Sequence, residues 1–203
     1  MKQVEYFYSS HSAFAYFGSA TFNRIVRDCG ARVIHRPVDL RVLLNAVGPG
    51  PTGNLTNARH AYFFGTEIER WSAFRQAPID RIRPTHHDND LALSSGMLLA
   101  AIELNQDIDA LAHHMLQAHW RDNADLAAAA DLRHIAAAAG LSAEPLLDLA
   151  MTPEIQQRFQ ANTQEAIERT VFGSPTYIID GVMYYGQDRL DFVKEHLEHL
   201  PAN

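Results

Sequence analysis

The chain has a single cysteine, Cys29. It therefore cannot form an intrachain disulfide, and it has neither a Cys-x-x-Cys redox pair nor a cysteine-based zinc site. Cys29 ends an apolar helical pattern, which is typical of a small core residue. One unpaired thiol is compatible with a reducing environment, and we expect a cytoplasmic protein.

Positive charge is also scarce. The 203 residues include 17 Lys and Arg against 24 Asp and Glu, a formal net charge of −7. Nucleic acids and anionic membranes are bound through basic faces, so neither is expected as the main partner. No segment approaches the roughly 18 apolar residues of a membrane span, and the N-terminus lacks a signal-peptide pattern. We expect a soluble, unexported protein.

The first forty residues have the pattern of a strand, a helix and a second strand. Residues 3–9 and 31–38 have strand patterns, and residues 13–29 between them have apolar side chains at helical spacing. Gly30 follows the last helical turn, where a left-handed residue commonly ends a helix. So short a strand–helix–strand unit predicts a parallel pair with a right-handed crossover.

The middle of the chain shows only helical periodicity. It predicts five helices, over residues 57–76, 91–104, 107–121, 127–139 and 153–169. The last part returns to strands at 175–180 and 182–186, joined by an Asp-Gly turn, before a closing helix over 188–199. This order, β-α-β, helices, then β-β-α, is the α/β thioredoxin topology split by a helical insertion. We expect residues 1–40 and 170–203 to form the thioredoxin-like domain and residues 41–169 an all-helical insertion domain.

Serines fill the loop between the first strand and the first helix, Ser9-Ser10-His11-Ser12-Ala13. The amino end of a helix favours an anion such as a thiolate, because its amides are unpaired and its dipole is positive there. With no cysteine nearby, a thiolate would come from a ligand, and the Ser12 hydroxyl would donate a hydrogen bond to it. The alternative is that Ser9, Ser10 and Ser12 only cap the helix, which local spacing alone favours.

Two further segments flank the last strands. A cis peptide bond at Ser174-Pro175 would present the backbone N–H and C=O of Ser174 to a peptide-like ligand, although a trans proline is commoner at a strand start. The Asp188 carboxylate is able to accept a hydrogen bond from a ligand ammonium. A cap for the last helix is the more common use of an aspartate at that position.

Together these segments carry a family resemblance. VEYFYSSHSAFAYF and VFGSPTYIIDGVMYYGQDRLDFV resemble the opening and closing segments of the 2-hydroxychromene-2-carboxylate isomerase and kappa-class glutathione transferase family. The resemblance spans essentially the whole chain, strongly at both ends and weakly in the middle. It implies a DsbA-like split thioredoxin fold without the redox cysteines.

The resemblance also implies an activity. It points to a homodimeric, glutathione-dependent isomerase of aromatic catabolism, with glutathione as a recycled cofactor and a small aromatic-derived substrate. The alternatives are a kappa-class transferase that conjugates glutathione to electrophiles, and a non-catalytic thioredoxin-fold binding module.

Individual residues take roles from the same resemblance. The thiol-activating serine of the family corresponds to Ser12, and the cis-proline pair that grips the cysteinyl part of glutathione corresponds to Ser174 and Pro175. The pair that holds the γ-glutamyl end corresponds to Gln187 and Asp188.

The start of the insertion departs from the family pattern. An asparagine that reaches the bound thiol or substrate in relatives corresponds to Asn54. A lysine that many relatives have shortly afterwards has no counterpart, and His60 or Arg59 is the candidate to hold the glycyl carboxylate. His11 and Ala13 beside Ser12 also differ from the apolar residue and proline expected there. This difference leaves open a substrate other than that of the family.

Aromatic residues and histidines are the other notable features of the insertion. Four aromatic residues at helical spacing would either roof the site or pack within the insertion, and packing is favoured for most of them: Tyr62, Phe63, Phe64 and Trp71. The adjacent His86 and His87, and the histidines at 113, 114 and 119, lack metal-ligand spacing. They are expected to be solvated or partly packed, with no metal site.

Overall fold

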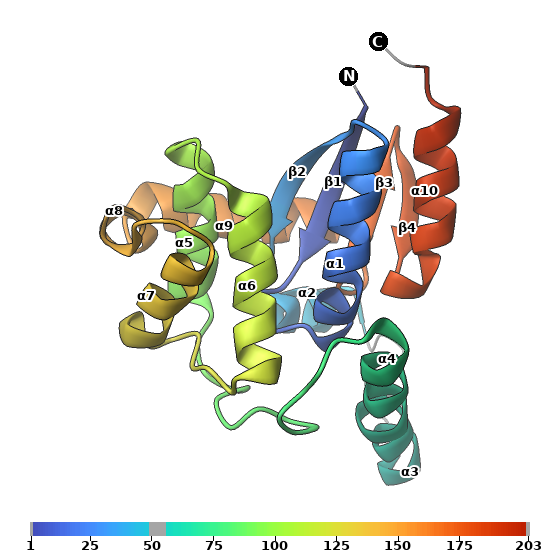
Figure 1. Cartoon of the computed structure of the whole chain (residues 1–203), viewed down its shortest axis with the longest axis horizontal. Coiled ribbons are helices and arrows are strands. Elements are labelled where there is room, and N and C mark those ends of the chain that lie inside the picture. The colour runs from blue at the N-terminus through green and yellow to red at the C-terminus, as the bar shows by residue number, and fades with distance from the viewer. Residues whose placement is uncertain (1, 49–55, 202–203) are drawn as a thin grey trace.

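The computed structural model describes residues 2–48 and 56–201, in which a four-stranded mixed sheet has helices on both faces (Figure 1). The strands are β1 (Gln3–Tyr8), β2 (Arg32–Pro37), β3 (Thr176–Ile179) and β4 (Val182–Tyr185). Their order in the sheet is β2-β1-β3-β4. β1 is parallel to β2, whereas the β1–β3 and β3–β4 pairs are antiparallel. This arrangement confirms the predicted thioredoxin-like α/β fold with a helical insertion.

Most of the chain between and around the strands is helical. The helices are α1 (Ala13–Asp28), α2 (Leu40–Ala46), α3 (Asn57–Ala61), α4 (Glu67–Arg75), α5 (Ala92–Glu103), α6 (Ile108–Arg121), α7 (Ala129–Ala138), α8 (Ala143–Ala150), α9 (Pro153–Glu168) and α10 (Leu190–His199). A π-helical segment, Tyr62–Thr66, joins α3 to α4 within the single helix predicted over 57–76. The short helices α2 and α8 were not predicted, because about two turns show little periodicity. None of the described helices is long and apolar enough to cross a membrane.

Side-chain alternation along the strands builds two apolar clusters on opposite faces of the sheet. Tyr6, Tyr8 and Tyr177 lie in the main core with residues of α1 and α10, the two helices in front of the sheet in Figure 1. Phe7 and Ile178 lie in a second cluster with residues of α2 and α9. Because successive residues point to opposite faces, β1, β3 and β4 each contribute to both clusters.

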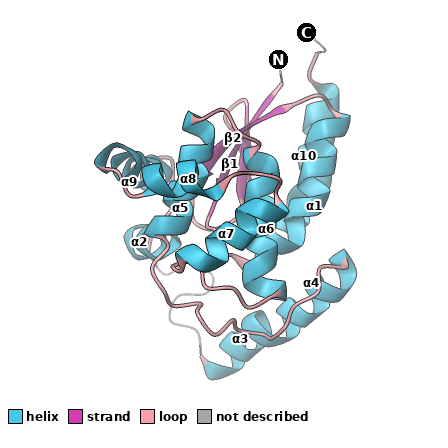
Figure 2. Cartoon of the chain, turned by 60° about the vertical axis from the view of Figure 1, so that its left-hand side comes forward, coloured by secondary structure: helices cyan, strands magenta, loops and turns pink. Residues whose placement is uncertain are grey.

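The helices of the insertion extend the main core away from the sheet. Residues of α5, α6, α7 and α8 belong to the same apolar cluster as those of α1. Figure 2 shows the other part of the insertion, α3 and α4, at one end of the molecule, and both views place it below the sheet. The amino end of α1 faces this end, so α4 contacts α1 where the Ser12 loop begins the helix.

Three tyrosines stack within the main core. The Tyr6 ring lies 4.2 Å from the Tyr8 ring and 5.3 Å from the Tyr177 ring, nearly parallel to both. The Tyr8 hydroxyl and His35 Nδ1 are hydrogen-bonded at 3.1 Å. Within the described part of the chain, the buried hydroxyls of Tyr6 and Tyr177 have no partner. Each therefore carries the free-energy cost of a buried, unsatisfied polar group.

We expect Tyr6→Phe and Tyr177→Phe each to raise the free energy of unfolding by about 1 kcal/mol, because each removes that unsatisfied hydroxyl. Tyr8→Phe is the matched control and is expected to lower it by about 1 kcal/mol, since His35 Nδ1 loses its partner. Urea unfolding followed by circular dichroism measures all three variants. A loss of stability in Tyr6→Phe would contradict this account of the stack.

Candidate active site

The loop after β1 brings Ser12 to the amino end of α1. Ser12 has the extended backbone of a helix cap (φ −72°, ψ 122°), and its Oγ accepts a hydrogen bond from the Ala15 N–H at 3.3 Å. The Ser12 hydroxyl also donates to the carbonyl oxygen of Ser174 at 3.1 Å. The capping prediction is therefore confirmed for Ser12, and its hydroxyl lies directly beside the Ser174–Pro175 pair.

The neighbouring serines hold the loop in place. The backbone N–H of Ser9 donates to Ser174 Oγ at 3.0 Å, and Ser10 Oγ lies 3.0 Å from Ser94 Oγ on α5. Both Ser9 and Ser10 are fully buried. The prediction that they cap α1 is wrong, because their polar groups join segments that are far apart in the sequence.

The Ser174–Pro175 peptide bond is cis, as the resemblance implied. The Pro175 carbonyl accepts a hydrogen bond from the Gly186 N–H at 2.9 Å, which ties this turn to the end of β4. Within residues 2–48 and 56–201 the Ser174 N–H has no acceptor, so it is able to donate to a ligand. Gly173 allows the close packing of Tyr185, because a Cβ at that position would collide with the Tyr185 ring.

Two adjoining cavities open beside this turn. The first, which we call the Ser12 cavity, has a volume of about 200 Å³, and its lining includes His11, Ser12, His60, Phe64, His87 and Trp120. The second, the Asp188 cavity, has a volume of about 180 Å³, and its lining includes Phe63, Glu67, Trp71, Gln187 and Asp188. Phe14, Ser174 and Tyr185 line both. The two cavities therefore adjoin across these residues, and we refer to them together as the groove.

The two predicted residues after β4 have different surroundings: Gln187 is bonded to α4, and Asp188 faces the groove. Gln187 is only 2% exposed, and its side-chain Oε1 accepts a hydrogen bond from Arg75 Nε at 2.8 Å. Arg75 Nη2 also donates to the Gln187 carbonyl at 2.9 Å, so α4 holds this turn through both groups. The Asp188 side chain lines the groove, 3.6 Å from Arg189 Nη2. The prediction that Asp188 caps the last helix is wrong, because a 3₁₀ turn intervenes and α10 has no side-chain cap.

The insertion contributes part of the predicted set. Asn54 lies outside the described residues. His60 lines the Ser12 cavity, with its ring 4.8 Å from the Phe64 ring. Arg59 is exposed on α3 and lines neither of the two cavities. Of the two candidates for the missing lysine, the structure therefore brings His60 to the groove.

The aromatic residues after α3 form one side of the groove. Phe64 lines the Ser12 cavity, and Phe63 and Trp71 line the Asp188 cavity. Tyr62 is 48% exposed and lines neither. Three of the four therefore line the groove, and Phe64 and Trp71 also pack against the main core, as the favoured alternative predicted.

Three histidines cluster beside the Ser12 cavity, of which His11 and His87 line it. The ring of His87 lies 4.6 Å from the ring of His11 and 5.3 Å from that of His119. His87 Nδ1 and His119 Nε2 are 3.0 Å apart, and His119 Nδ1 lies 3.0 Å from the Ala124 carbonyl oxygen. His87 is partly buried, in line with a partly packed histidine. The prediction that His119 is solvated or partly packed is wrong, because it is only 1% exposed. No local spacing links the two positions, so only the folded chain reveals the cluster.

Burial keeps this cluster neutral. The pKa of His87 is lowered from 6.5 to about 3, mainly by removal from water. The charges of His119, Arg83 and Arg41 contribute to this lowering, and Asp88 opposes it. Removal from water is also the main reason why the pKa of His11 lies well below 6.5 and that of His119 is lowered.

These shifts predict a loss of stability in acid. Between about pH 6.5 and 3 the unfolded chain binds a proton at His87 that the folded chain does not. The free energy of unfolding therefore decreases as the pH is lowered through this range. We expect His87 alone to account for about 2 kcal/mol of loss between pH 6.5 and pH 5. Urea unfolding of wild type and His87→Asn at both pH values measures this contribution. Equal losses in the two proteins would contradict it.

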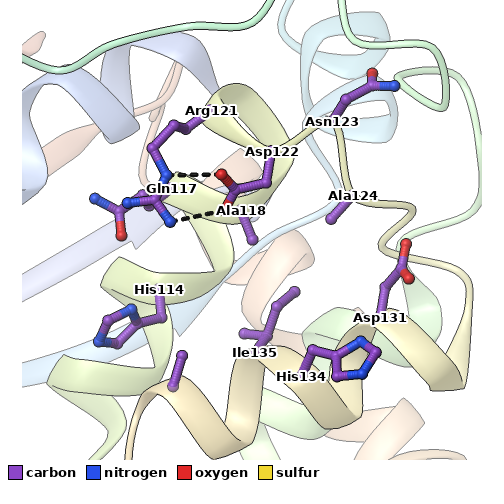
Figure 3. A pocket seen from close by; sticks show the side chains of 11 residues that line it. His114, Gln117, Ala118, Arg121, Asp122, Asn123, Ala124, Asp131, His134 and Ile135 are labelled. Carbon is purple, nitrogen blue, oxygen red and sulfur yellow. Dashed lines mark hydrogen bonds and ion pairs between the residues drawn. The ribbon is translucent and has the colours of Figure 1, made fainter.

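A separate cavity of about 260 Å³ lies between α6 and α7. Figure 3 shows His114 and Arg121 of α6 on one side of it, and Asp131 and His134 of α7 on the other. Arg121 is held by a two-pronged ion pair with Asp122. This cavity takes in neither the loop after β1 nor the Ser174–Pro175 turn, so we place the candidate active site at the groove.

Comparison with known proteins agrees with this fold. The sequence profile of the DSBA-like thioredoxin domain matches residues 3–198. The chain belongs to this family. It is 24% identical over 200 residues to a 2-hydroxychromene-2-carboxylate isomerase of Sphingobium xenophagum, covering 97% of this chain and 98% of that protein.

Solved structures share the fold of this DSBA-like chain. A 2-hydroxychromene-2-carboxylate isomerase aligns with a TM-score of 0.80 at 20% identity, covering 96% of this chain and 94% of the other. The cytosolic disulfide reductase DsbM of Pseudomonas aeruginosa, solved with GSH, aligns with a TM-score of 0.67 at 16% identity over 97% of each chain.

This DSBA-like domain has a hydroxyl at its helix terminus. Ser12 occupies the amino end of α1, whereas Cys29 lies at the opposite end of the same helix, partly buried against the main core. The groove therefore has no protein thiol, and a thiolate there would belong to a ligand.

Proposed function

We propose that this protein is a glutathione-dependent isomerase for a substrate of the 2-hydroxychromene-2-carboxylate class. The observation that carries the proposal is the Ser12 hydroxyl, which lies at the amino end of α1 and 3.1 Å from the carbonyl oxygen of Ser174. Three relatives at 22–24% identity over nearly the whole chain are isomerases of that name, which supports the choice of reaction. A protein of the same fold was solved with GSH.

The groove has the groups that a γ-glutamyl tripeptide needs. The Ser174 N–H is able to donate to a backbone carbonyl of the tripeptide, and the Asp188 carboxylate is able to accept from its ammonium. His60 is the proposed partner of the glycyl carboxylate, and Asn54 that of the thiol or substrate. When bound, glutathione supplies a thiolate that adds reversibly to the unsaturated substrate and leaves again, so that a bond can rotate in between.

Ser12 would act on the thiol through its single proton. Its O–H donates to the Ser174 carbonyl, and rotation about the Cβ–Oγ bond turns the same proton towards a sulfur atom in the Ser12 cavity. The Ser174 carbonyl is then able to accept a ligand N–H instead. A hydrogen bond to the thiolate and the positive end of α1 both lower the thiol pKa, each unit contributing about 1.4 kcal/mol.

The Ser12 cavity suits an aromatic carboxylate. Phe64 and Ile68 provide an apolar wall, and Arg83, paired with Asp88 at 2.5 Å, provides a cation at the edge. An aromatic ring would pack on the apolar wall while its carboxylate approaches the guanidinium. Phe63 and Trp71 remain on the side of the groove that would hold glutathione.

The test combines binding with turnover. Calorimetric titration with glutathione is compared with S-methylglutathione, which lacks the thiol, and isomerisation of 2-hydroxychromene-2-carboxylate is followed with and without glutathione. We expect binding, and turnover only when glutathione is present and not consumed. Stoichiometric consumption would identify a kappa-class conjugating transferase instead. Absence of binding and turnover would leave a thioredoxin-fold binding module.

A further inference from the structure

The hydrogen bonds of the histidine cluster determine where its protons lie. A carbonyl oxygen only accepts, so His119 Nδ1 donates to the Ala124 oxygen at 3.0 Å. His119 is neutral, because burial lowers its pKa, and its Nε2 is therefore an acceptor. His87 Nδ1, 3.0 Å from that nitrogen, must be the donor.

This arrangement leaves a lone pair on His87 Nε2. The His87 ring is neutral because burial lowers its pKa to about 3, so only one of its nitrogens carries a proton. In the described part of the chain Nε2 has no hydrogen-bond partner, yet it is not among the fully buried polar atoms that lack one. His87 lines the Ser12 cavity and His119 does not. The unprotonated nitrogen is therefore not fully buried, and the ring that carries it lines the cavity.

The His87 ring is held firmly in this orientation. Arg41 Nη2 on α2 donates to the His87 backbone carbonyl at 2.7 Å, and the ring packs edge-on against Trp120 with centroids 5.4 Å apart. In the described part of the chain, no group of three or more His, Cys, Asp or Glu side chains is arranged to hold a metal ion. The ring therefore offers a basic nitrogen whose tautomer is fixed by the bond to His119.

We infer that His87 Nε2 accepts a hydroxyl proton from the substrate in the Ser12 cavity, with His119 as the positioning residue that keeps Nε2 unprotonated. This inference rests on the proposed function and adds to it a requirement: the substrate must carry an ionisable hydroxyl. A bound thiolate and a substrate carboxylate place negative charge in the cavity, which raises the pKa of His87 when a base is needed.

The proton transfer balances within the proposed substrate class. In a 2-hydroxychromene the hydroxyl and the ring oxygen are attached to the same carbon. As Nε2 takes the hydroxyl proton, the O–H electron pair becomes the π bond of a ketone, and the bond from that carbon to the ring oxygen breaks. The electron pair stays on the ring oxygen as a phenolate, and the His87 imidazolium returns the same proton to it. The product is the open-chain unsaturated ketone, the electrophile that the proposed isomerisation requires.

The test compares wild type with His87→Asn and with the matched control His114→Asn. An asparagine amide at position 87 keeps an N–H close to that of Nδ1 and has no basic nitrogen, whereas His114 lies on the separate cavity of Figure 3. With 2-hydroxychromene-2-carboxylate and saturating glutathione, we expect His87→Asn to lower kcat about 10²-fold or more. We expect glutathione affinity to be unchanged, and His114→Asn to match wild type.

Two additional variants separate catalysis from structure. Imidazole added to His87→Gly is expected to restore part of the lost kcat, which a purely structural defect would not allow. His119→Gln keeps an acceptor for the Nδ1–H of His87 and is expected to retain more kcat than His119→Leu. The pH profile is recorded for each, because His119, Arg41, Arg83 and Asp88 influence the pKa of His87, and His87 in turn lowers that of His11.

The outcomes are distinct. Unchanged kcat in His87→Asn overturns the inference and leaves the proposed function intact. A loss of kcat that is accompanied by lost glutathione binding, or that imidazole does not rescue, overturns it as well. If wild type neither binds glutathione nor turns over, the proposed function has failed, and the inference fails with it.

Discussion

Ser12→Ala is expected to lower kcat of the proposed isomerisation about 10²-fold, because it removes a hydrogen-bond donor at the site where thiolate charge resides. The bound thiol loses the stabilisation of its ionised form, so its pKa is expected to rise. Ultraviolet absorbance of the thiolate, followed against pH with glutathione bound, measures that pKa. Glutathione affinity is expected to fall much less than kcat above the thiol pKa of the variant.

The same substitution also removes the cap of α1, and a control has to account for that loss. Asp107 caps α6 in the same way, with its carboxylate accepting from the Ala110 N–H at 3.0 Å. Ser12→Ala and Asp107→Ala are each expected to cost about 1 kcal/mol of stability. Only Ser12→Ala is expected to shift the thiol pKa. Equal thiol pKa values in the two variants would refute the proposed role of the serine.

Gly96→Ala is expected to destabilise the folded protein by about 3 kcal/mol, the largest stability effect that we predict. Gly96 lies on α5 where that helix meets the end of α8, and a Cβ there would collide with the Ala150 carbonyl oxygen. It would also lie 2.8 Å from Gln156 Nε2, which donates to that same carbonyl at 2.7 Å. Backbone cannot yield as a flexible side chain does, so the two helices must separate.

Gly65→Ala is the matched control for this prediction. Gly65 is also helical, and a Cβ there would meet nothing within 4 Å. An alanine is therefore expected to raise stability by up to about 1 kcal/mol, through the reduced entropy of the unfolded chain. Thermal and urea unfolding measure both variants. A small effect of Gly96→Ala would show that α5 and α8 tolerate a wider spacing.

The predictions of secondary structure were right where the hydrophobic pattern was long or the turn sequence was specific. The strand expected over 3–9 is β1 (Gln3–Tyr8), and the Asp-Gly turn has positive φ at both Asp180 and Gly181, as a two-residue hairpin requires. The prediction failed at α2, a helix of 7 residues, and at the Asp188 cap. Both failures have the same reason: a short segment takes its conformation from the surface on which it packs.

In the candidate site too, local features were predictable from the sequence and long-range contacts were not. Ser12 was accessible to sequence reasoning, because a helix start and a serine loop are local features. Arg75 was not, since its hydrogen bonds to Gln187 join positions 112 residues apart. Trp120 was also missed: its indole N–H donates to the His11 carbonyl at 2.9 Å across a similar separation. Helical periodicity predicts that such residues lie on a buried side of the helix, but not which residues they contact.

By itself, the sequence determined the order of strands and helices, the lack of a protein thiol at the amino end of α1, and the serine that takes its place. These are properties of neighbouring residues, and periods of two and 3.6 residues record them directly. Only the tertiary structure decided that Phe63, Phe64 and Trp71 line the groove, and that His87 of the groove meets His119 at hydrogen-bond distance. Proton positions and cavity walls depend on contacts between distant segments, and such contacts leave no periodic trace in the chain.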